Sequence, residues 1–299
     1  MRYLLTARIE MEISVEASSD FPFIDVVIPF GGNFDYLIQT VESVITQEYP
    51  FWHLYILDDN TQLDSLQNYV RRLDNPKVTL IRYEYKLGII KIFDESISTF
   101  KNEWGMILGA DDLLEKDFLH EMSLAIKKFP KSILIQPSIK IIDSKTQEIY
   151  PFVDKVKSLL RGRMKEGVVS KRKLTRTLVL GNWMYFGASV FNTKFLKANR
   201  FNPDLQIAMD YELILRMVEI GAQIVTWPAA VFSYRRHSLS YSNSVEHLDF
   251  RFKEEMKIMR EYSEKLKDRN IYFASMFARS GITMRMYYLL AKIQHKVMK

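Results

Sequence analysis

The chain has 299 residues, of which 47% are hydrophobic and 26% are charged, and it contains no cysteine. This composition is ample for a folded core, and the lack of cysteine excludes disulfides, thiolate metal sites and a cysteine nucleophile. The net charge of +6 is compatible with phosphorylated, nucleic-acid or membrane partners, but we find no nucleic-acid-binding motif and expect no nucleic-acid partner.

The first twenty residues differ from a secretory signal, because charged side chains interrupt them at Arg8, Glu10, Glu12 and Glu16. The longest uncharged run, 177–193, is shorter than the roughly 20 apolar residues that span a bilayer. We therefore interpret 1–20 as an N-terminal extension and expect a cytoplasmic catalytic body.

Short apolar strands alternate with helical patterns between residues 24 and 108. The expected strands are 24–30, 53–58, 78–83 and 104–108, and the expected helices are 34–47, 63–73 and 89–99. This alternation predicts an α/β fold with a Rossmann-like, mostly parallel sheet flanked by helices. Ligands of such sheets bind beyond the carboxyl ends of the strands. Three polar stretches are expected at that edge: FGGN at 30–33, DDNT at 58–61 and ADD at 110–112.

The pattern is less regular beyond residue 115. We expect a strand at 132–136, a mobile basic loop or short helix at 154–174, and a loop or strand with exposed aromatic residues at 178–190. Further along, the spacing predicts a helix at 209–220, strands at 224–227 and 230–234, and long helices at 245–268 and 271–299. The last two lie outside the α/β alternation, so 243–299 is interpreted as a helical C-terminal extension.

Asp111 and Asp112 follow an apolar strand directly. Adjacent carboxylates repel one another unless they are solvated or share a cation, and hard oxygen ligands suit Mg²⁺ or Mn²⁺. The alternative is a turn or helix cap before LLEKDFL. Asp58 and Asp59 are likewise either an ordinary turn or a second acidic loop for nucleoside binding.

Other polar residues also have two interpretations. Asp210 is either a general base for an acceptor hydroxyl or a first-turn carboxylate favoured by the helix dipole. His237, with Arg235 and Arg236, either contacts a metal and a leaving diphosphate or is a solvated loop residue. The basic residues from 155 to 173 are either a solvated face or a mobile loop over a phosphate.

In their order along the chain, these segments resemble an inverting nucleotide-sugar glycosyltransferase of family 2 with a GT-A fold. The resemblance rests on IDVVIPF with GGN, LQNYV, TLIRYEYKLGI, WGMILGADDLL, GNWMYFGASVF, AMDYELILRM and YRRHSLSYS. It implies a GT-A catalytic domain at 21–242, with a nucleotide-binding half at about 21–115 and an acceptor half at about 116–242.

The resemblance also implies roles for individual residues. Nucleotide binding is implied for Pro29, Phe30, Gly31, Asp59, Lys86 and Asp111. Binding of Mn²⁺ or Mg²⁺ is implied for Asp112, Asp111 and His237, contact with the diphosphate for Arg235 and Arg236, and catalysis as the base for Asp210. Acceptor binding is expected in the region 150–205, at Trp183 and Tyr185.

Three positions depart from the family pattern. Gly109 stands where a further aspartate is frequent, Lys86 stands where asparagine is usual before a glycine, and Met209 replaces the frequent glutamate beside the base.

The implied reaction is a direct displacement that moves a sugar from a UDP- or dTDP-type donor to a hydroxyl of a saccharide or lipid-linked acceptor. We expect it to serve cell-surface polysaccharide or glycolipid synthesis. One alternative is a catalytically silent nucleotide-sugar-binding protein. The absence of the family's frequent carboxylates at Gly109 and Met209 is compatible with this alternative. The other is a nucleotidyltransferase, although FGGNFDY lacks the basic residue of a phosphate loop.

The chain has no acidic residue from position 269 onward, and its basic residues there are mixed with apolar ones. This pattern favours a peripheral contact with the inner membrane face. A helix packed on the catalytic domain, or a homodimer formed through 243–299, is the alternative.

Overall fold

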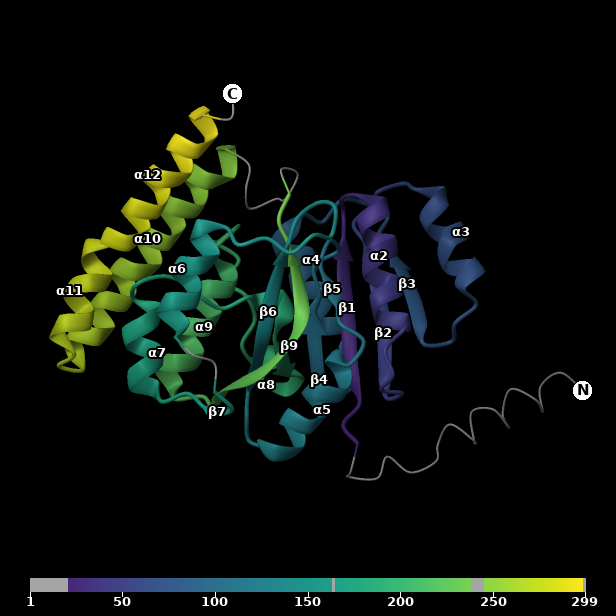
Figure 1. Ribbon diagram of the computed structural model, residues 1–299, viewed down its shortest axis with the longest axis horizontal. Helices are drawn as coiled ribbons and strands as arrows, with labels where there is room; N and C mark the ends of the chain where they lie inside the picture. The colour runs from purple at the N-terminus through teal and green to yellow at the C-terminus, as the bar shows by residue number, and fades with distance from the viewer. Residues whose placement is uncertain (1–20, 163–164, 238–244, 298–299) are drawn as a thin grey trace, which may run out of the picture.

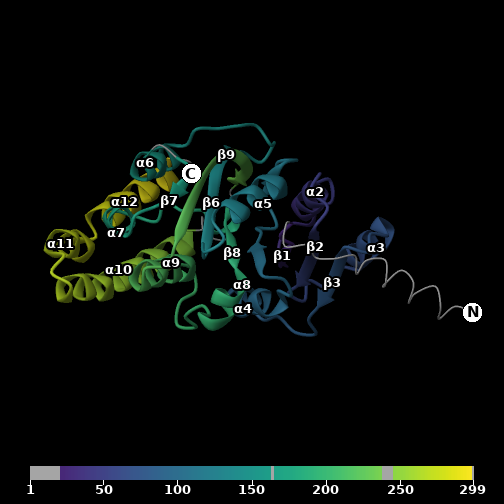
Figure 2. The same cartoon turned by 90° about the horizontal axis from the view of Figure 1, so that it is seen from below.

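The computed structural model describes residues 21–162, 165–237 and 245–297. A central sheet carries helices on both faces, and the C-terminal helices pack at one side of it (Figure 1). Seen from below, α2 and α5 lie on one side of the sheet and α4 and α8 on the other (Figure 2). The predicted α/β sheet flanked by helices, with a helical C-terminal part, is confirmed.

The first half of the sheet is parallel, as predicted. Its strands are β1 (Ile24–Phe30), β2 (Trp52–Asp58), β3 (Val78–Arg82) and β4 (Trp104–Ile107), in the order β3-β2-β1-β4. They are connected by α2 (Phe34–Ile45), α3 (Asp64–Leu73) and α4 (Ile89–Thr99). Helices cover both faces, so β1 is apolar at nearly every position, and the one buried charge in it, Asp25, accepts hydrogen bonds from the backbone of Lys101 and Asn102.

The second half of the sheet is mixed. Its elements are β5 (Leu113–Leu114), α5 (Phe118–Lys128), β6 (Leu134–Ile142), α6 (Phe152–Arg161), β7 (Gly167–Val168), α7 (Lys171–Leu178), β8 (Val190–Asn192), α8 (Thr193–Ala198), α9 (Met209–Ile220) and β9 (Ile224–Arg235). The full strand order is β3-β2-β1-β4-β8-β6-β9-β5, with β7 paired to β9. Strand β8 is antiparallel to both of its neighbours, whereas β6 and β9 are parallel.

Two predictions for this half are corrected. The expected loop or short helix at 154–174 contains most of α6, then β7 and the start of α7, and the two expected late strands are one strand, β9. Pro228 interrupts the apolar pattern of β9, but the register with β6 shifts at Pro137 and Ser138, and the strand continues past the irregularity.

The C-terminal part forms three helices: α10 (Val245–Asp268), α11 (Tyr272–Ser280) and α12 (Ile282–Val297). The predicted single helix at 271–299 is wrong, because Gly281 adopts a left-handed conformation (φ 55°) that ends α11. Met259 and Leu266 of α10 are buried in the same hydrophobic cluster as Leu213 of α9, so α10 packs on the α/β part of the chain.

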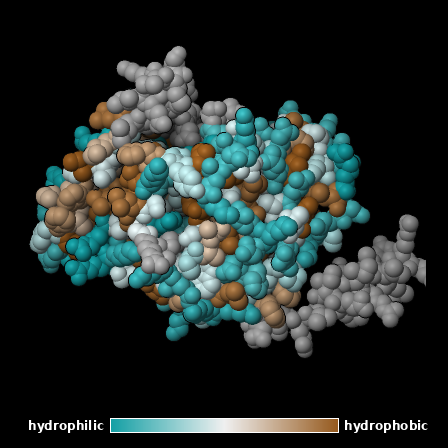
Figure 3. Space-filling view, viewed as in Figure 1, coloured by the Kyte–Doolittle hydropathy of each residue, from teal (hydrophilic) through white to brown (hydrophobic). Residues whose placement is uncertain are grey.

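Apolar side chains of α11 and α12 remain on the surface. Apolar residues gather over the end of the molecule where these helices lie (Figure 3). The exposed ones include Tyr272, Phe273, Met276, Ile282, Met286 and Leu289. Contact with a membrane or with a second copy stays a prediction. No helix in the described ranges has the length and apolar character needed to cross a bilayer.

Candidate functional site

The polar stretches expected at one edge of the sheet do lie at the ends of adjacent parallel strands. Phe30, the last residue of β1, pairs with Asp58, the last residue of β2. Beyond the end of β4, Leu108 donates its backbone N–H to Val27 of β1 at 2.8 Å. The loops that follow these strands therefore leave the same edge of the sheet.

Asp111 and Asp112 lie in the turn between β4 and β5. Helix α5 begins only at Phe118, after Asp117, so the helix-cap interpretation of the two aspartates is wrong. Asp112 is buried, and its Oδ1 accepts the backbone N–H of Arg235 at 2.9 Å. Burial and the neighbouring Asp111 raise the pKa of Asp112 well above its usual value, while the hydrogen bond and charge of Arg235 oppose the rise.

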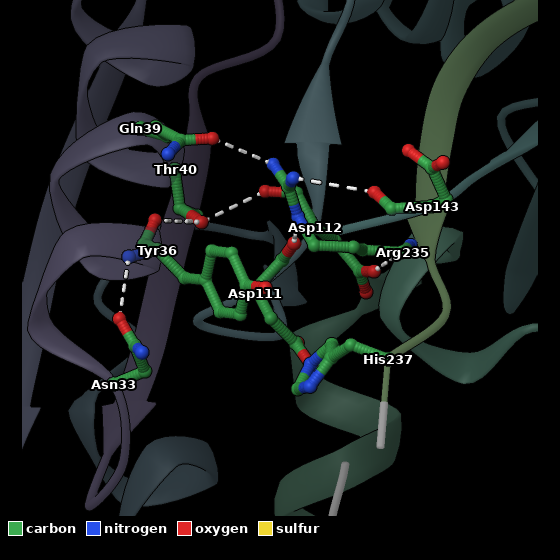
Figure 4. A network of polar contacts seen from close by, with 9 residues as sticks. All are labelled: Asn33, Tyr36, Gln39, Thr40, Asp111, Asp112, Asp143, Arg235 and His237. Atoms are coloured by element: carbon green, nitrogen blue, oxygen red, sulfur yellow. Dashed lines mark hydrogen bonds and ion pairs between the residues drawn. The ribbon is translucent and has the colours of Figure 1, made fainter. Parts of the chain in front are cut away.

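Arg235 ties this turn to helix α2 and is 1% exposed. Its Nε donates to the backbone oxygen of Asp111 at 2.7 Å, and its Nη2 donates to Oε1 of Gln39 at 2.8 Å (Figure 4). Thr40 of the same helix donates its hydroxyl to the backbone oxygen of Asp112 at 2.8 Å. With its guanidinium occupied in this way, Arg235 orients the aspartates, and its contact with a diphosphate stays a prediction.

His237 lies against the first aspartate. Its Nε2 is 2.7 Å from Oδ2 of Asp111, and its ring packs on Tyr36 with 4.9 Å between ring centres. Its Nδ1 is buried and has no hydrogen-bond partner in the described part of the chain. Two carboxylates and an imidazole are suitable donors for Mn²⁺ or Mg²⁺. Even so, no set of three or more His, Asp or Glu side chains within the described ranges is already arranged to hold an ion.

The glycine at position 109, where the resemblance leads one to expect an aspartate, has a steric reason. A Cβ atom at this position would lie 2.8 Å from Oδ2 of Asp112 and 3.0 Å from Oδ1 of Asp111. Both carboxylates therefore fold over the glycine, and an aspartate at position 109 would displace them.

A cavity of about 290 Å³ joins the aspartates to the start of α9. Of the predicted site residues, it is lined by Asp111, Asp112, Tyr185, Asp210 and Arg236. Asp210 accepts the backbone N–H of Tyr211 at 2.7 Å and the side-chain amide of Asn182 at 3.3 Å. Burial raises the pKa of Asp210, while Arg251 and Lys157 oppose the rise. A carboxylate of raised pKa that faces a cavity is a suitable general base.

Apart from Asp111, the predicted nucleotide residues lie outside this cavity. The Phe30 ring is 1% exposed and belongs to the core, so a contact of this residue with the nucleobase, which stays a prediction, would have to use its backbone. Pro29 is half-buried, whereas Gly31 and Lys86 are exposed. Asp59 accepts the backbone N–H groups of Leu87 at 2.5 Å and Gly88 at 3.1 Å and so holds the loop after β3.

Asp58 has the structural role that its turn interpretation predicts. Its side chain is buried, pairs with Arg82 at 3.0 Å and accepts hydrogen bonds from the backbone and hydroxyl of Thr61.

The aromatic residues Trp183 and Tyr185 are buried, so their expected exposure is wrong. Trp183 donates its indole N–H to Thr177 of α7 at 3.0 Å, and Tyr185 donates its hydroxyl to Asp154 of α6 at 2.6 Å. Helix α6 thus provides a buried polar partner for this segment. Their role in acceptor binding stays a prediction.

Comparison with known proteins decides the family. Residues 25–190, more than half of the chain, match the model for Glycosyl transferase family 2. The chain belongs to glycosyl transferase family 2. The predicted recognition is confirmed.

Relatives of this family 2 chain include two proteins of Escherichia coli. The "Putative colanic acid biosynthesis glycosyl transferase WcaA" of strain K12 is 25% identical over 213 residues, which cover 66% of each chain. Chondroitin synthase is 23% identical over 246 residues, which cover 82% of this chain and 33% of that protein.

Among solved structures, S. aureus TarS 1-349 in complex with UDP-GlcNAc matches with a TM-score of 0.62 at 15% identity. The match covers 82% of this chain and 66% of TarS 1-349, and it supports the GT-A fold. The chain thus spans at most 66% of the length of each of these three proteins.

The family 2 cavity is completed by residues that carry no motif. Lys157 of α6, Arg251 and Glu255 of α10, and Tyr287 of α12 line it, so the C-terminal extension forms one of its walls. Beside the cavity, Glu254 accepts backbone N–H groups of the loop that leads into α9. In the sequence, the signal for this wall is the spacing of three charged residues on one face of a helix: Arg251, Glu254 and Glu255.

Proposed function

We propose that the protein is an inverting glycosyltransferase that moves a sugar from a UDP- or dTDP-type donor to a hydroxyl of a saccharide or lipid-linked acceptor. The observation that carries the proposal is the cavity lined by Asp111, Asp112 and Asp210 in a family 2 chain. The names of two relatives refer to colanic acid and chondroitin, which supports a role in cell-surface polysaccharide synthesis, with glycolipid synthesis as the related alternative. The UDP-GlcNAc complex of TarS supports a UDP-type donor.

Asp210 is the proposed base. Its carboxylate takes the proton of the acceptor hydroxyl while that oxygen attacks the anomeric carbon, and the bond between that carbon and the diphosphate oxygen breaks. A single displacement inverts the anomeric configuration. Hydrogen bonds from Asn182 and from the backbone of Tyr211 hold the carboxylate toward the cavity.

Asp111, Asp112 and His237 are the proposed holders of Mn²⁺ or Mg²⁺. When bound there, the ion would offset negative charge on the diphosphate of the donor. Arg236 adds positive charge at the same cavity, and its two hydrogen bonds to Asp154, both 2.7 Å, fix its guanidinium.

Binding of the nucleoside is proposed for Pro29, Gly31, Asp59, Lys86 and Asp111, as the family resemblance implies. Asp59 orders the loop that contains Lys86 through its hydrogen bonds to Leu87 and Gly88.

A screen of nucleotide sugars tests the proposed function. The full chain is mixed with each UDP- and dTDP-sugar and Mn²⁺, and thermal stabilisation and release of the free nucleoside diphosphate are measured. We expect one donor to stabilise the fold and to be consumed. Stabilisation without consumption in the presence of acceptors would favour the silent binding protein, and release of inorganic pyrophosphate from a nucleoside triphosphate would favour the nucleotidyltransferase.

A further inference from the structure

A second cavity of about 320 Å³ lies next to the first. It is bounded by strand β6, by residues 148–151 and by helix α6. Lys157 and Tyr185 line both cavities, so the second cavity lies directly beside the one that contains Asp210. None of the roles proposed above uses this space apart from the acceptor role of Trp183 and Tyr185.

The carboxylates of the second cavity already have partners. Asp154 forms the two-bond pair with Arg236 and accepts the Tyr185 hydroxyl, and Glu148 accepts the hydroxyl of Tyr150 at 2.9 Å. Asp154 acts electrostatically on Lys157, but its hydrogen bonds are taken up by Arg236 and Tyr185.

Three cations of the cavity form no direct ion pair with a carboxylate of the described residues: Lys155, Lys157 and Arg161. The Nε of Arg161 is buried and has no hydrogen-bond partner in the described part of the chain. Lys157 places its ammonium 4.4 Å from the ring centre of Tyr185. Burial, together with Arg251 and Arg236, lowers the pKa of Lys157 to about 8, against the opposing charges of Asp154 and Asp210. A desolvated cation that forms no direct ion pair is stabilised when an anion binds beside it.

Aromatic surface accompanies these charges. Tyr150 is 70% exposed at the cavity, and Trp183 and Tyr185 contribute to its wall. Apolar ring surface next to fixed polar groups is the usual lining of a small-molecule site, and here it can contact the carbon face of a sugar ring.

We propose that the second cavity binds an anionic group of the acceptor glycan, a carboxylate or a phosphate, through Lys157 and Arg161. The proposal rests on the proposed transferase function and names its acceptor class: an acidic glycan whose charged group lies near the hydroxyl that reacts at Asp210. A neutral glycan would leave both cations without a direct ion pair.

Binding of three defined probes to the full chain tests this proposal. The probes are an unsulfated chondroitin tetrasaccharide, the same compound after reduction of its carboxyl groups, and a glycerol phosphate tetramer, each titrated in the presence of UDP and Mn²⁺. We expect at least one anionic probe to bind about 10-fold tighter than the neutral one, in line with a charge-assisted contact. The two anionic probes distinguish a carboxylate acceptor from a phosphate acceptor.

Substitutions assign the effect to the cavity. Lys157→Gln and Arg161→Gln should each remove most of this preference, whereas Lys157→Arg and Arg161→Lys, which keep the charge, should retain it. Arg172→Gln is the matched control, because Arg172 is an exposed cation of α7 that lines neither of these two cavities.

The slow hydrolysis of the donor by water is measured as well. It reports on the proposed transferase function without an acceptor, so the two proposals can fail separately. Equal binding of all three probes, or loss of the preference in Arg172→Gln as well, overturns the anionic acceptor even where the donor is hydrolysed. Anion binding through Lys157 and Arg161 in a chain that consumes no donor refutes the transferase and with it the acceptor assignment.

Discussion

Glu254 of α10 accepts the backbone N–H of Ala208 at 2.9 Å, two residues before the proposed base. The same carboxylate also accepts the N–H groups of Gln206 at 2.6 Å and Ile207 at 2.9 Å. A negative charge at this position favours the N-terminus of α9, whose first turn contains Asp210. The C-terminal extension thus positions the loop and the helix start that carry the base.

The first prediction concerns this carboxylate. Glu254→Gln loses the charge and one acceptor oxygen, so we expect transfer to fall about 10-fold, mainly in kcat, with a loss of about 1–3 kcal/mol in the free energy of unfolding. Kinetics and urea unfolding measure the two effects. Glu261→Gln, at an exposed carboxylate of the same helix, is the control. Unchanged kcat in a destabilised Glu254→Gln variant would reduce Glu254 to a structural residue.

Asp210→Asn tests the base. The amide keeps the shape of the side chain but cannot take a proton, so transfer should fall by about 10²- to 10⁴-fold while nucleotide affinity stays the same. Calorimetry with UDP and a transfer assay measure both. Glu212→Gln is the control on the same helix turn, because Glu212 pairs with Arg216 at 2.8 Å instead of lining the cavity. Full transfer by Asp210→Asn with nucleotide bound would exclude Asp210 as the base.

The pH dependence of transfer follows from the raised pKa of Asp210. A base acts only when ionised, so the rate should rise with pH through this pKa. Lys157 helps to keep the pKa down, so Lys157→Gln should move the acidic limb of the profile to higher pH. An acidic limb that stays in place in this variant would contradict the assignment.

The raised pKa of Asp210 also affects the free energy of unfolding. Because the folded pKa of Asp210 lies above the usual 3.8, the folded state binds more protons between the two values, and stability falls as pH rises through that window. Near pH 7, well above the usual value, Asp210→Asn should therefore be more stable than the parent chain, and unfolding of both at pH 3 and pH 7 would measure the difference. A variant less stable than the parent at pH 7 would contradict the direction of the shift.

Gly109 provides a test of the metal proposal. A chelator should abolish transfer and Mn²⁺ should restore it. Gly109→Ala places a Cβ within 3.0 Å of both aspartates, so we expect a loss of about 10-fold in activity at low Mn²⁺ that higher Mn²⁺ partly restores. Gly32→Ala, where a Cβ would meet nothing within 4 Å, is the control. Transfer that is insensitive to chelator would remove the metal from the proposal.

Local patterns in the sequence were sufficient to predict several elements in both halves of the sheet. Strand β1 and helices α4 and α9 have the predicted bounds, because their apolar periods and end residues are contained in each segment. By contrast, the burial of Arg235 depends on Gln39, almost two hundred positions away, and the burial of Trp183 and Tyr185 depends on α6 and α7. The wall formed by α10 and α12 carries no motif. Long-range packing, rather than local propensity, determines the burial of these side chains and the position of this wall.

The surface of α11 yields the last prediction. Tyr272, Phe273 and Met276 are exposed on this helix, and the chain has only basic charges beyond position 268. An apolar face with basic neighbours suits an anionic lipid surface. We expect the chain to co-sediment with vesicles of phosphatidylglycerol and phosphatidylethanolamine, less so at high salt, and about 10-fold less after Phe273→Ser combined with Met276→Ser.

Point substitutions suit this test better than removal of 271–299, because Ala274, Ala278 and Met284 of that segment are buried in the core and its loss would expose them. Leu159→Ser, at an 81% exposed position of α6, is the matched control. Binding to vesicles that Phe273→Ser and Met276→Ser leave unchanged would exclude this face from the contact. A dimer in light scattering that the same two substitutions dissociate would instead assign the face to a second copy of the chain, since one apolar surface cannot be covered by lipid and by protein at once.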